Sequence, residues 1–230
     1  MAQDEISFTD LIASSIHDMK NSLNLQVHAL EKIALQRRDL GDATTYTDLG
    51  QVIYQANRMH LNLVELLSLY KLGKAIYPLD IDSHAVAEVI EEAVLQNQAM
   101  LDFKGIHVSV DCPADCFWYL DRDLVKGVLV NALNNAYHYT LDKIHIVART
   151  KNQVLELRVE DNGPGYPERL LLQGDVASSK PVNFENGSTG LGFYFSDQVA
   201  RLHKNGDRRG ALSIANGGRY GGGCFVLQLP

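Results

Sequence analysis

Ten residues near the start of the chain, SSIHDMKNSL (Ser14–Leu23), combine a histidine, an acid, a lysine and an amide. Neutral imidazole is a nucleophile, and a neighbouring carboxylate can hold Nδ1–H so that Nε2 attacks an electrophile. Asp18 is placed to do this for His17, and Asn21 follows one helical turn later on the same face. A lone histidine on a helix is more often an ordinary surface or core residue, so the role of His17 depends on the rest of the chain.

Asparagines and an acid with ligand-binding potential occur much further along the chain. The stretch VNALNNAYHYT places Asn131 and Asn135 four residues apart on one helical face. Asparagine carbonyls are hard-oxygen ligands that suit Mg²⁺. The stretch EDNGPGYP ends a strand with Asp161, which can accept a hydrogen bond from an exocyclic amine while the glycines let the backbone approach a flat ring. Each stretch alone is more simply explained as surface amides or a plain turn.

A third stretch, NGSTGLGFYFSDQVA, places glycines where a helix is expected to begin. Backbone N–H groups and the positive end of the helix dipole form a phosphate cradle at such a junction. A glycine-rich turn alone is weak evidence. The order of the three stretches, with a polar loop over 174–188 before the last, carries more weight than any one of them.

Two amphipathic helices are expected to carry the histidine. Apolar residues recur at steps of three and four over Phe8–Arg37 and again over Leu49–Tyr70. Gly41 is a stop signal between them, and Asp42 or Thr44 is a candidate N-cap. Two such helices form an antiparallel hairpin, which buries too little alone and should pair with a second copy as a dimeric four-helix bundle.

After a linker at Lys71–Pro78, short strands mix with helices. Helices are predicted from His84 (capped by Ser83) to about Phe103, from Asp121 to His138, and from Gly190 to His203. Strands are predicted at YPLDI, IHVSV, CFWYL, KIHIVART, VLELRVED, GALSIAN and CFVLQLP. The chain is thus expected to be α + α/β: a helical hairpin over 1–75, then over 76–230 an α/β sandwich with a mostly antiparallel sheet and helices on one face.

Composition argues against several classes of protein. A net charge of −7 disfavours sequence-independent binding to nucleic acid. Three cysteines do not make a disulfide framework, and Cys112 and Cys116 have no second pair to complete a zinc site. The acidic N-terminus and the lack of an apolar run near ~18 residues predict a cytoplasmic segment without membrane contact, unless it was cut from a longer membrane protein.

The ordered motifs resemble those of sensor histidine kinases, whose ATP-binding domain belongs with gyrase, Hsp90 and MutL ATPases. NALNNAYHYT resembles the N box, DNGPG the G1 box and STGLGFYF the G2 box, and GGCFVLQLP is similar to the last strand of the family. HDMKNSL resembles the H box of the dimerisation and phosphotransfer domain. The resemblance covers nearly the whole chain. It implies an enzyme that uses ATP and Mg²⁺ to phosphorylate its own histidine and passes the phosphoryl group to an aspartate of a response regulator.

The resemblance implies roles in the ATP-binding domain. Asn135 would be the main Mg²⁺ ligand, Asn131 would lie beside the phosphates, and Asp161 would bond the adenine amine. Gly163 and Gly165 would let the base approach. The triphosphate would be lined by the residues at the start of the following helix: Gly190, Leu191 and Gly192.

Three departures from the family pattern affect the details of this site. His138 stands where the family usually has a lysine, which weakens one phosphate contact or makes it pH-dependent. Ser188 occupies a position that is often glycine. The resemblance implies that the polar loop over 174–188 forms a lid over the nucleotide. Phe184 lies within this lid, and no clear phenylalanine-centred F box precedes it.

In the hairpin, the resemblance implies that His17 accepts the phosphoryl group and that Asp18 orients it and acts as the base. Asn21, in the acid-x-x-Asn pattern, would orient a water that dephosphorylates the regulator. His28 is the competing acceptor because it returns to nearly the same helical face. Ala29 and Lys32 occupy the places that the acid and the amide hold beside His17.

Two other functions stay open. One is a non-catalytic phosphotransfer scaffold with a degenerate ATP domain. The intact Asn135 and Asp161 argue against it, whereas the departures from the family pattern at His138 and Ser188 are compatible with it. The other is an ATPase or serine kinase of the same superfamily, against which the preceding HDMKN argues. No sensor domain precedes Ile6, so the input is expected from a partner protein or from a region upstream.

Overall fold

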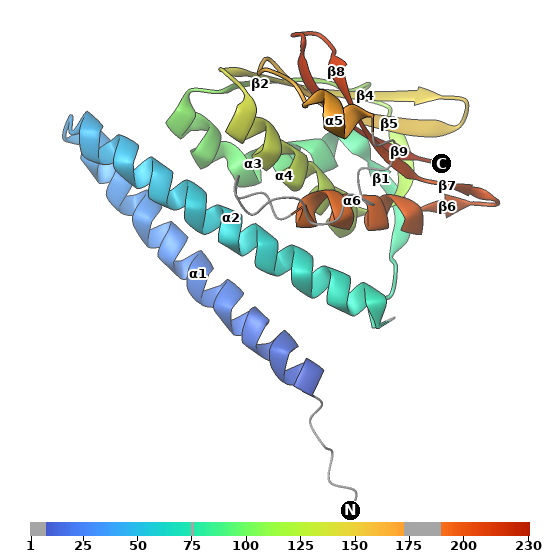
Figure 1. Cartoon of the computed structure of the whole chain (residues 1–230), viewed down its shortest axis with the longest axis horizontal. Helices are drawn as coiled ribbons and strands as arrows, with labels where there is room; N and C mark the ends of the chain where they lie inside the picture. The colour runs from blue at the N-terminus through green and yellow to red at the C-terminus, as the bar shows by residue number, and fades with distance from the viewer. Residues whose placement is uncertain (1–7, 75, 173–189) are drawn as a thin grey trace, which may run out of the picture. The chain divides into compact units, whose positions relative to one another are not determined.

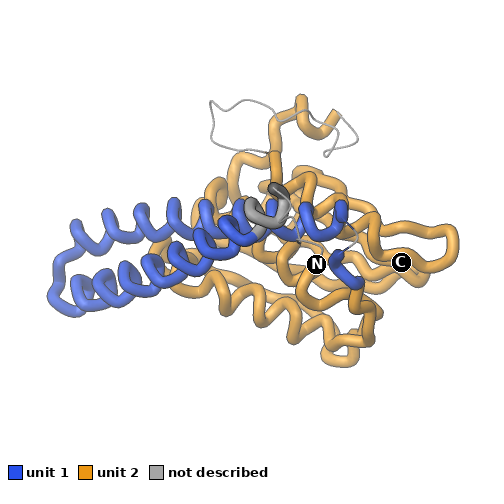
Figure 2. Tube along the Cα trace, turned by 90° about the horizontal axis from the view of Figure 1, so that it is seen from below, with its two compact units in different colours: residues 1–78 blue, residues 79–230 orange. Residues whose placement is uncertain are grey.

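The structure, a computed structural model, describes residues 8–74, 76–172 and 190–230, with side chains from Ser14 onward. Contacts along the chain divide it into two compact units, Met1–Pro78 and Leu79–Pro230 (Figures 1 and 2). Unit 1 is helical, and unit 2 combines helices with strands. Within the described ranges, no helix is long and apolar enough to cross a membrane.

Unit 1 is an antiparallel helical hairpin (Figure 1). Its helices, α1 (Phe8–Asp39) and α2 (Ala43–Gly73), confirm the two segments predicted from the apolar stripes. Gly41 adopts φ +75° in the turn, a left-handed conformation that glycine takes without steric cost. Asp42 caps α2 by accepting the Thr45 backbone N–H at 3.1 Å. Hydrogen bonds from the side chain and backbone of Thr45 lower the pKa of the Asp42 carboxyl.

Unit 2 is built on a sheet with the strand order β2–β4–β5–β9–β8. Its strands are β2 (His107–Asp111), β4 (Lys143–Lys151), β5 (Val154–Asp161), β8 (Ala211–Gly217) and β9 (Gly222–Leu229). The β2–β4 pair is parallel, whereas β4–β5, β5–β9 and β9–β8 are antiparallel. The predicted mostly antiparallel sheet is therefore confirmed.

Helices cover one face of this sheet (Figure 1). They are α3 (Val86–Lys104), α4 (Arg122–Tyr139) and α6 (Leu191–Leu202). Helix α4 contacts both α3 and α6, and it also contacts β5. Strands β1 (Ile81–Ala85) and β3 (Phe117–Asp121) form a separate antiparallel pair. The predicted α/β sandwich with helices on one face is confirmed.

The prediction for the start of unit 2 was wrong in its details. The sequence predicts a strand at YPLDI and a helix capped by Ser83, but Ser83 lies in β1 and pairs with Tyr119 of β3. Backbone hydrogen bonds to this distant strand override the local helix-capping signal, which a serine also offers in other contexts. The sequence analysis also missed short elements: α5 (Glu168–Leu171), β6 (Lys204–Asn205) and β7 (Arg208–Arg209).

The register of β4 and β5 decides which acid reaches the helix-covered face. Asp161 pairs with Ile144, which is 0% exposed in the core beneath the helices. Glu160 pairs with His145, and side chains of successive strand residues point to opposite faces. Asp161 therefore faces the helices at the end of β5, while the acid beside it points to the other side of the sheet.

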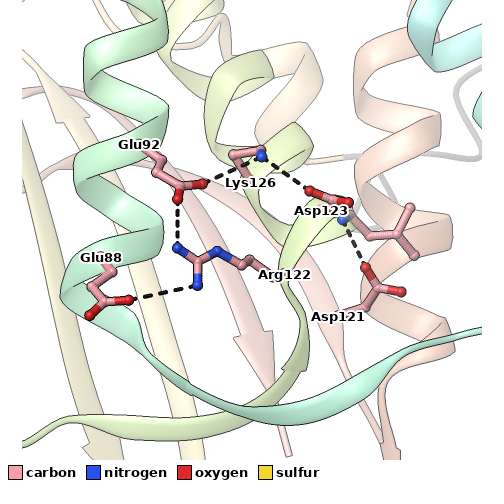
Figure 3. A network of polar contacts seen from close by, with 7 residues as sticks. Glu88, Glu92, Asp121, Arg122, Asp123 and Lys126 are labelled. Carbon is pink, nitrogen blue, oxygen red and sulfur yellow. Dashed lines mark hydrogen bonds and ion pairs between the residues drawn. The ribbon is translucent and has the colours of Figure 1, made fainter.

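A polar network fixes α4 against α3 (Figure 3). Arg122 of α4 contacts Glu92 at 2.5 Å and Glu88 at 3.6 Å, both on α3, and Lys126 contacts Glu92 at 3.4 Å. The hydrogen bond from Arg122 lowers the pKa of the Glu92 carboxyl. Asp121 caps α4 by accepting the Leu124 backbone N–H at 3.1 Å. The helix that carries the asparagines thus has a fixed beginning.

Lowering the pH is expected to destabilise unit 2 through His203, which is 3% exposed. Its Nδ1 donates to the Val199 carbonyl at 2.8 Å and its Nε2 accepts the Asp121 N–H at 3.0 Å, so the ring is neutral. Burial lowers the pKa of His203. Below the ordinary histidine pKa of about 6.5, His203 therefore binds a proton in the unfolded chain but not in the folded chain. The free energy of unfolding then falls by up to about 1.4 kcal/mol for each pH unit.

Thermal unfolding of the whole chain at a series of pH values between about 7 and 5 checks this. His203→Gln should lower stability at neutral pH but flatten the acid slope. Exposed His107→Gln is the matched control and should leave the slope as it is in the wild type. An unchanged slope in the His203 variant would refute the assignment.

Candidate nucleotide site and candidate phosphorylated histidine

Asp161 is a buried carboxylate held by backbone amides at the end of β5. It is 6% exposed, and its Oδ1 accepts the N–H groups of Gly163 at 2.7 Å and Gly223 at 3.1 Å. Among the described residues both bonds end on this one oxygen, so Oδ2 can accept a donor from a ligand. A carboxylate fixed in this way is a rigid, strong acceptor for an amine. The contribution of β9 through Gly223 was missed by the sequence analysis, because it joins segments far apart in the chain.

Glycines beside Asp161 are also required by close packing within the protein. A Cβ on Gly163 would lie 2.4 Å from the carbonyl oxygen of Tyr139 at the end of α4. Gly165 has φ +79°, and a Cβ there would lie 2.7 Å from Oδ1 of Asn216. The resemblance implies that these glycines let a base approach. In addition, the turn has no room for a side chain at either position.

The two asparagines predicted from the N box lie together on α4 but differ in their surroundings. Asn131 is 4% exposed, donates from Nδ2 to Ser196 Oγ at 3.0 Å, and accepts at Oδ1 from Asn135 Nδ2 at 3.5 Å. A Cβ on Gly192 would lie 2.3 Å from Asn131 Oδ1, so α6 begins directly against this amide. Asn135 is half-buried. Asn131 therefore joins α4 to α6, and Asn135 is the more accessible amide; Ser196 was missed by the sequence analysis.

The start of α6 has the geometry expected of a glycine-rich helix N-terminus. Gly190 is the N-cap at φ +67°, and the Tyr194 N–H donates to its carbonyl at 3.1 Å. Leu191 and Gly192 follow as the first helical residues and are half-buried. The positive end of the helix dipole at such a glycine-rich N-terminus favours an anion.

His138, which stands where the family usually has a lysine, lies at the C-terminal end of α4. It is exposed on the last turn, and its ring lies edge-to-face with that of Tyr139 at 4.6 Å between centroids. The predicted lid over 174–188, with Phe184, Gly187 and Ser188, lies outside the described residues.

A group of aromatic side chains that was not predicted from the sequence begins at Tyr166, near Asp161. Tyr166 and Phe193 meet edge-to-face at 6.2 Å, and Phe193 stacks with Phe225 at 6.0 Å between centroids. Burial, followed by the nearby Asp161 carboxylate, raises the pKa of the Tyr166 hydroxyl, which stays neutral. Segments after β5, at the start of α6 and in β9 thus build an apolar wall near the acid, which suits a flat heterocycle.

His17 is exposed on α1 with both predicted neighbours in reach. Its Nδ1 lies 3.5 Å from Asp18 Oδ1 and 3.4 Å from Asn21 Nδ2, at the outer limit of hydrogen bonding. The two contacts select opposite tautomers. The Nδ1–H form donates to Asp18 and has its lone pair on Nε2, whereas the Nε2–H form accepts from Asn21 at Nδ1.

His28, the competing histidine, also has an acidic neighbour. Its Nδ1 lies 3.3 Å from Oε2 of Glu31, three residues later. This acid lies three residues after the histidine, a position that differs from the one and four residues that separate His17 from Asp18 and Asn21, and it was not predicted. What sets His17 apart is the combination of an acid and an amide at the same ring nitrogen.

The chain is similar to known proteins, both in its second part and over its whole length. Residues 120–230 match the family described as histidine kinase-, DNA gyrase B-, and HSP90-like ATPase. Sensor-like histidine kinase SenX3 of Mycobacterium tuberculosis is 25% identical over 239 residues, which cover 100% of this chain and 55% of that protein. Adaptive-response sensory kinase SasA of Gloeothece citriformis is 25% identical over 241 residues, covering 99% and 59%. The chain thus spans little more than half the length of these relatives.

Solved structures show the same fold. The catalytic domain of histidine kinase ThkA has a TM-score of 0.57 at 22% identity, with 66% of this chain and 96% of that chain covered. Acinetobacter baumannii histidine kinase AdeS has a TM-score of 0.58 at 20% identity, covering 88% and 94%. Residues 120–230 therefore form a domain of the histidine kinase-, DNA gyrase B- and HSP90-like ATPase family, and the chain, a helical hairpin followed by this domain, is similar over its whole length to sensor histidine kinases.

Proposed function

We propose that this chain is an ATP-dependent protein histidine kinase that phosphorylates His17 and passes the phosphoryl group to an aspartate of a response regulator. Residues 1–75 serve as the dimerisation and phosphotransfer hairpin, and residues 76–230 as the ATP-binding domain. The observation that carries the proposal is the set of polar groups held in place in unit 2. Asp161 accepts two backbone amides, Asn131 and Asn135 are hydrogen-bonded to each other on α4, and the same chain exposes a histidine with an acid beside it.

Different residues of unit 2 recognise the adenine and the phosphates of ATP. Asp161 accepts the adenine amine at Oδ2, and the aromatic wall of Tyr166 and Phe193 receives the ring. The start of α6 faces the phosphates with its N–H groups. Asn135 offers Mg²⁺ a neutral, accessible amide oxygen, whereas Asn131 is committed to internal bonds and holds Asn135 in place. When bound, ATP supplies the phosphoryl group and Mg²⁺ neutralises its charge.

His17 performs its step through tautomer selection. Asp18 accepts Nδ1–H and so keeps the lone pair on Nε2, the atom that attacks phosphorus. The carboxylate also stabilises the positive charge that develops on the ring as the bond forms. Both side chains are exposed, so a phosphoryl donor and later a receiver domain can approach them.

A second copy of the chain is the expected partner of the hairpin. Several large apolar side chains are exposed on its two helices: Met19, Leu25, Ile33, Leu35, Val52, Met59 and Leu66. Covering them in a four-helix bundle removes apolar surface from water, which is the main driving force for such association. The regulator receiver domain is the second partner.

The function is tested by incubating the whole chain with Mg²⁺ and γ-labelled ATP. We expect label that acid removes and base does not, as for phosphohistidine, and its transfer to an added receiver domain. A chain that binds no ATP but takes phosphoryl from a phosphorylated protein donor would instead be the non-catalytic relay scaffold. ATP hydrolysis without any label on the chain would place it with the ATPases that use no histidine.

Asn21→Ala is expected to separate the two directions of the reaction. Because its amide contacts Nδ1 rather than the attacking Nε2, autophosphorylation should stay within about twofold of the wild type. Dephosphorylation of the regulator, for which the amide would orient water, should slow by at least about tenfold. Autophosphorylation is measured by incorporation of label from γ-labelled ATP, and dephosphorylation is measured with purified phosphorylated regulator. Asn24→Ala, an exposed asparagine on the same helix, is the control. Equal loss of both activities would contradict the role of Asn21.

A further inference from the structure

Asn162, the residue after the adenine-binding acid, is the centre of a dense hydrogen-bond cluster. Its Oδ1 accepts the Thr140 hydroxyl at 2.7 Å and the backbone N–H groups of Leu141, Asp142 and Lys143 at 3.1, 3.2 and 3.1 Å. Its Nδ2 donates to Asp142 Oδ1 at 2.7 Å. The loop that follows α4 is therefore wrapped around one amide side chain.

This cluster fastens the end of α4 to the turn after β5. Thr140 is the C-cap residue of α4 and is 3% exposed. Tyr139 beside it is the residue whose carbonyl oxygen a Cβ on Gly163 would approach to 2.4 Å. From the other side, Lys104 of α3 donates to the carbonyls of Tyr137 at 2.6 Å and Thr140 at 3.0 Å. The helix end has little freedom to move relative to Asp161.

We propose that Asn162 is a positioning residue that sets purine selectivity, by holding Asp161 at a fixed place relative to α4. The inference rests on the proposed function, in which α4 carries the asparagines at the phosphate end of the nucleotide. A nucleotide can contact the adenine-binding acid and the phosphate end of the site together only when the distance between these two parts of the site stays constant. Loosening the cluster lets Asp161 shift, and discrimination falls because adenine presents an amine where guanine presents a carbonyl oxygen.

The amide–carboxylate pair Asn162–Asp142 permits a charge-swap test. Asn162→Asp keeps an acceptor for the four donors but sets two carboxylates against each other where a bond of 2.7 Å existed. We expect ATP affinity and the ATP-over-GTP preference each to fall on the order of tenfold, because a hydrogen bond becomes a like-charge contact. Adding Asp142→Asn restores one amide and one carboxylate, and both values should return to within about threefold of the wild type.

The measurements are titrations of the whole chain with Mg²⁺–ATP and Mg²⁺–GTP, alongside thermal unfolding. Leu157→Ala, a cavity in the sheet core, should lower the unfolding temperature without changing the nucleotide preference, which separates positioning from general stability. An Asn162→Asp variant with wild-type preference overturns the proposal, and so does a folded double variant that does not recover. If the single variant does not fold, a folded double variant with wild-type preference supports the proposal. A wild type that binds no ATP overturns the proposed function, whereas ATP binding without purine preference overturns this inference alone.

Discussion

His17→Gln is expected to reduce acid-labile phosphate on the chain by at least about a hundredfold, because glutamine has no nucleophilic nitrogen to replace Nε2. Glutamine is polar and of similar length, so it should preserve the helix and the contacts with Asp18 and Asn21. The measurement is incorporation from γ-labelled ATP, with ATP affinity followed in parallel. Affinity should stay close to that of the wild type, because the histidine lies outside the nucleotide-binding residues of unit 2.

His28→Gln is the matched control, since His28 lies on the same helix and also has an acidic neighbour, Glu31 at 3.3 Å. It should retain labelling within about twofold. The reverse result, with label lost in the His28 variant and kept in the His17 variant, would show that an acid three residues after the histidine suffices. It would also remove the significance given to the pair Asp18 and Asn21.

Asp161→Asn is expected to weaken ATP binding by at least about a hundredfold while preserving the fold. The new side chain keeps an Oδ1 that accepts from Gly163 and Gly223, so the turn can retain its shape. Its NH₂ group replaces Oδ2, however, and then faces the adenine amine donor to donor. Discrimination against GTP should fall as well, because guanine offers an acceptor at that position.

Glu160→Gln is the control for the neighbouring acid. Glu160 lies on the opposite face of the sheet, where it accepts the Arg219 N–H at 2.7 Å and pairs with Arg158 at 2.9 Å. Its loss should lower the unfolding temperature but leave ATP affinity within about threefold. Calorimetric titration with ATP and thermal unfolding of both variants give the result. Unchanged affinity in a folded Asp161→Asn variant would exclude this carboxylate from adenine recognition.

The elements of both units were largely predictable because their signals are local. Apolar residues at helical spacing marked α1 and α2, and alternation marked β4 and β5. The start of unit 2 was not predictable in the same way, because Ser83 is a strand residue through its pairing with Tyr119. A pairing partner more than thirty residues away leaves no trace in a short window of sequence.

The order of the motifs and the immediate neighbours of His17 follow from the sequence alone. Helix geometry is the same in every protein, so a residue four positions after another lies on the same face whatever the tertiary structure, as Asn21 does after His17. The contacts that hold the candidate nucleotide site together depend on the tertiary structure. Gly223 reaches Asp161 and Ser196 reaches Asn131 through strand register and helix packing, which depend on the whole domain. These contacts join residues distant in the chain, and the spacing within any one motif carries no information about them.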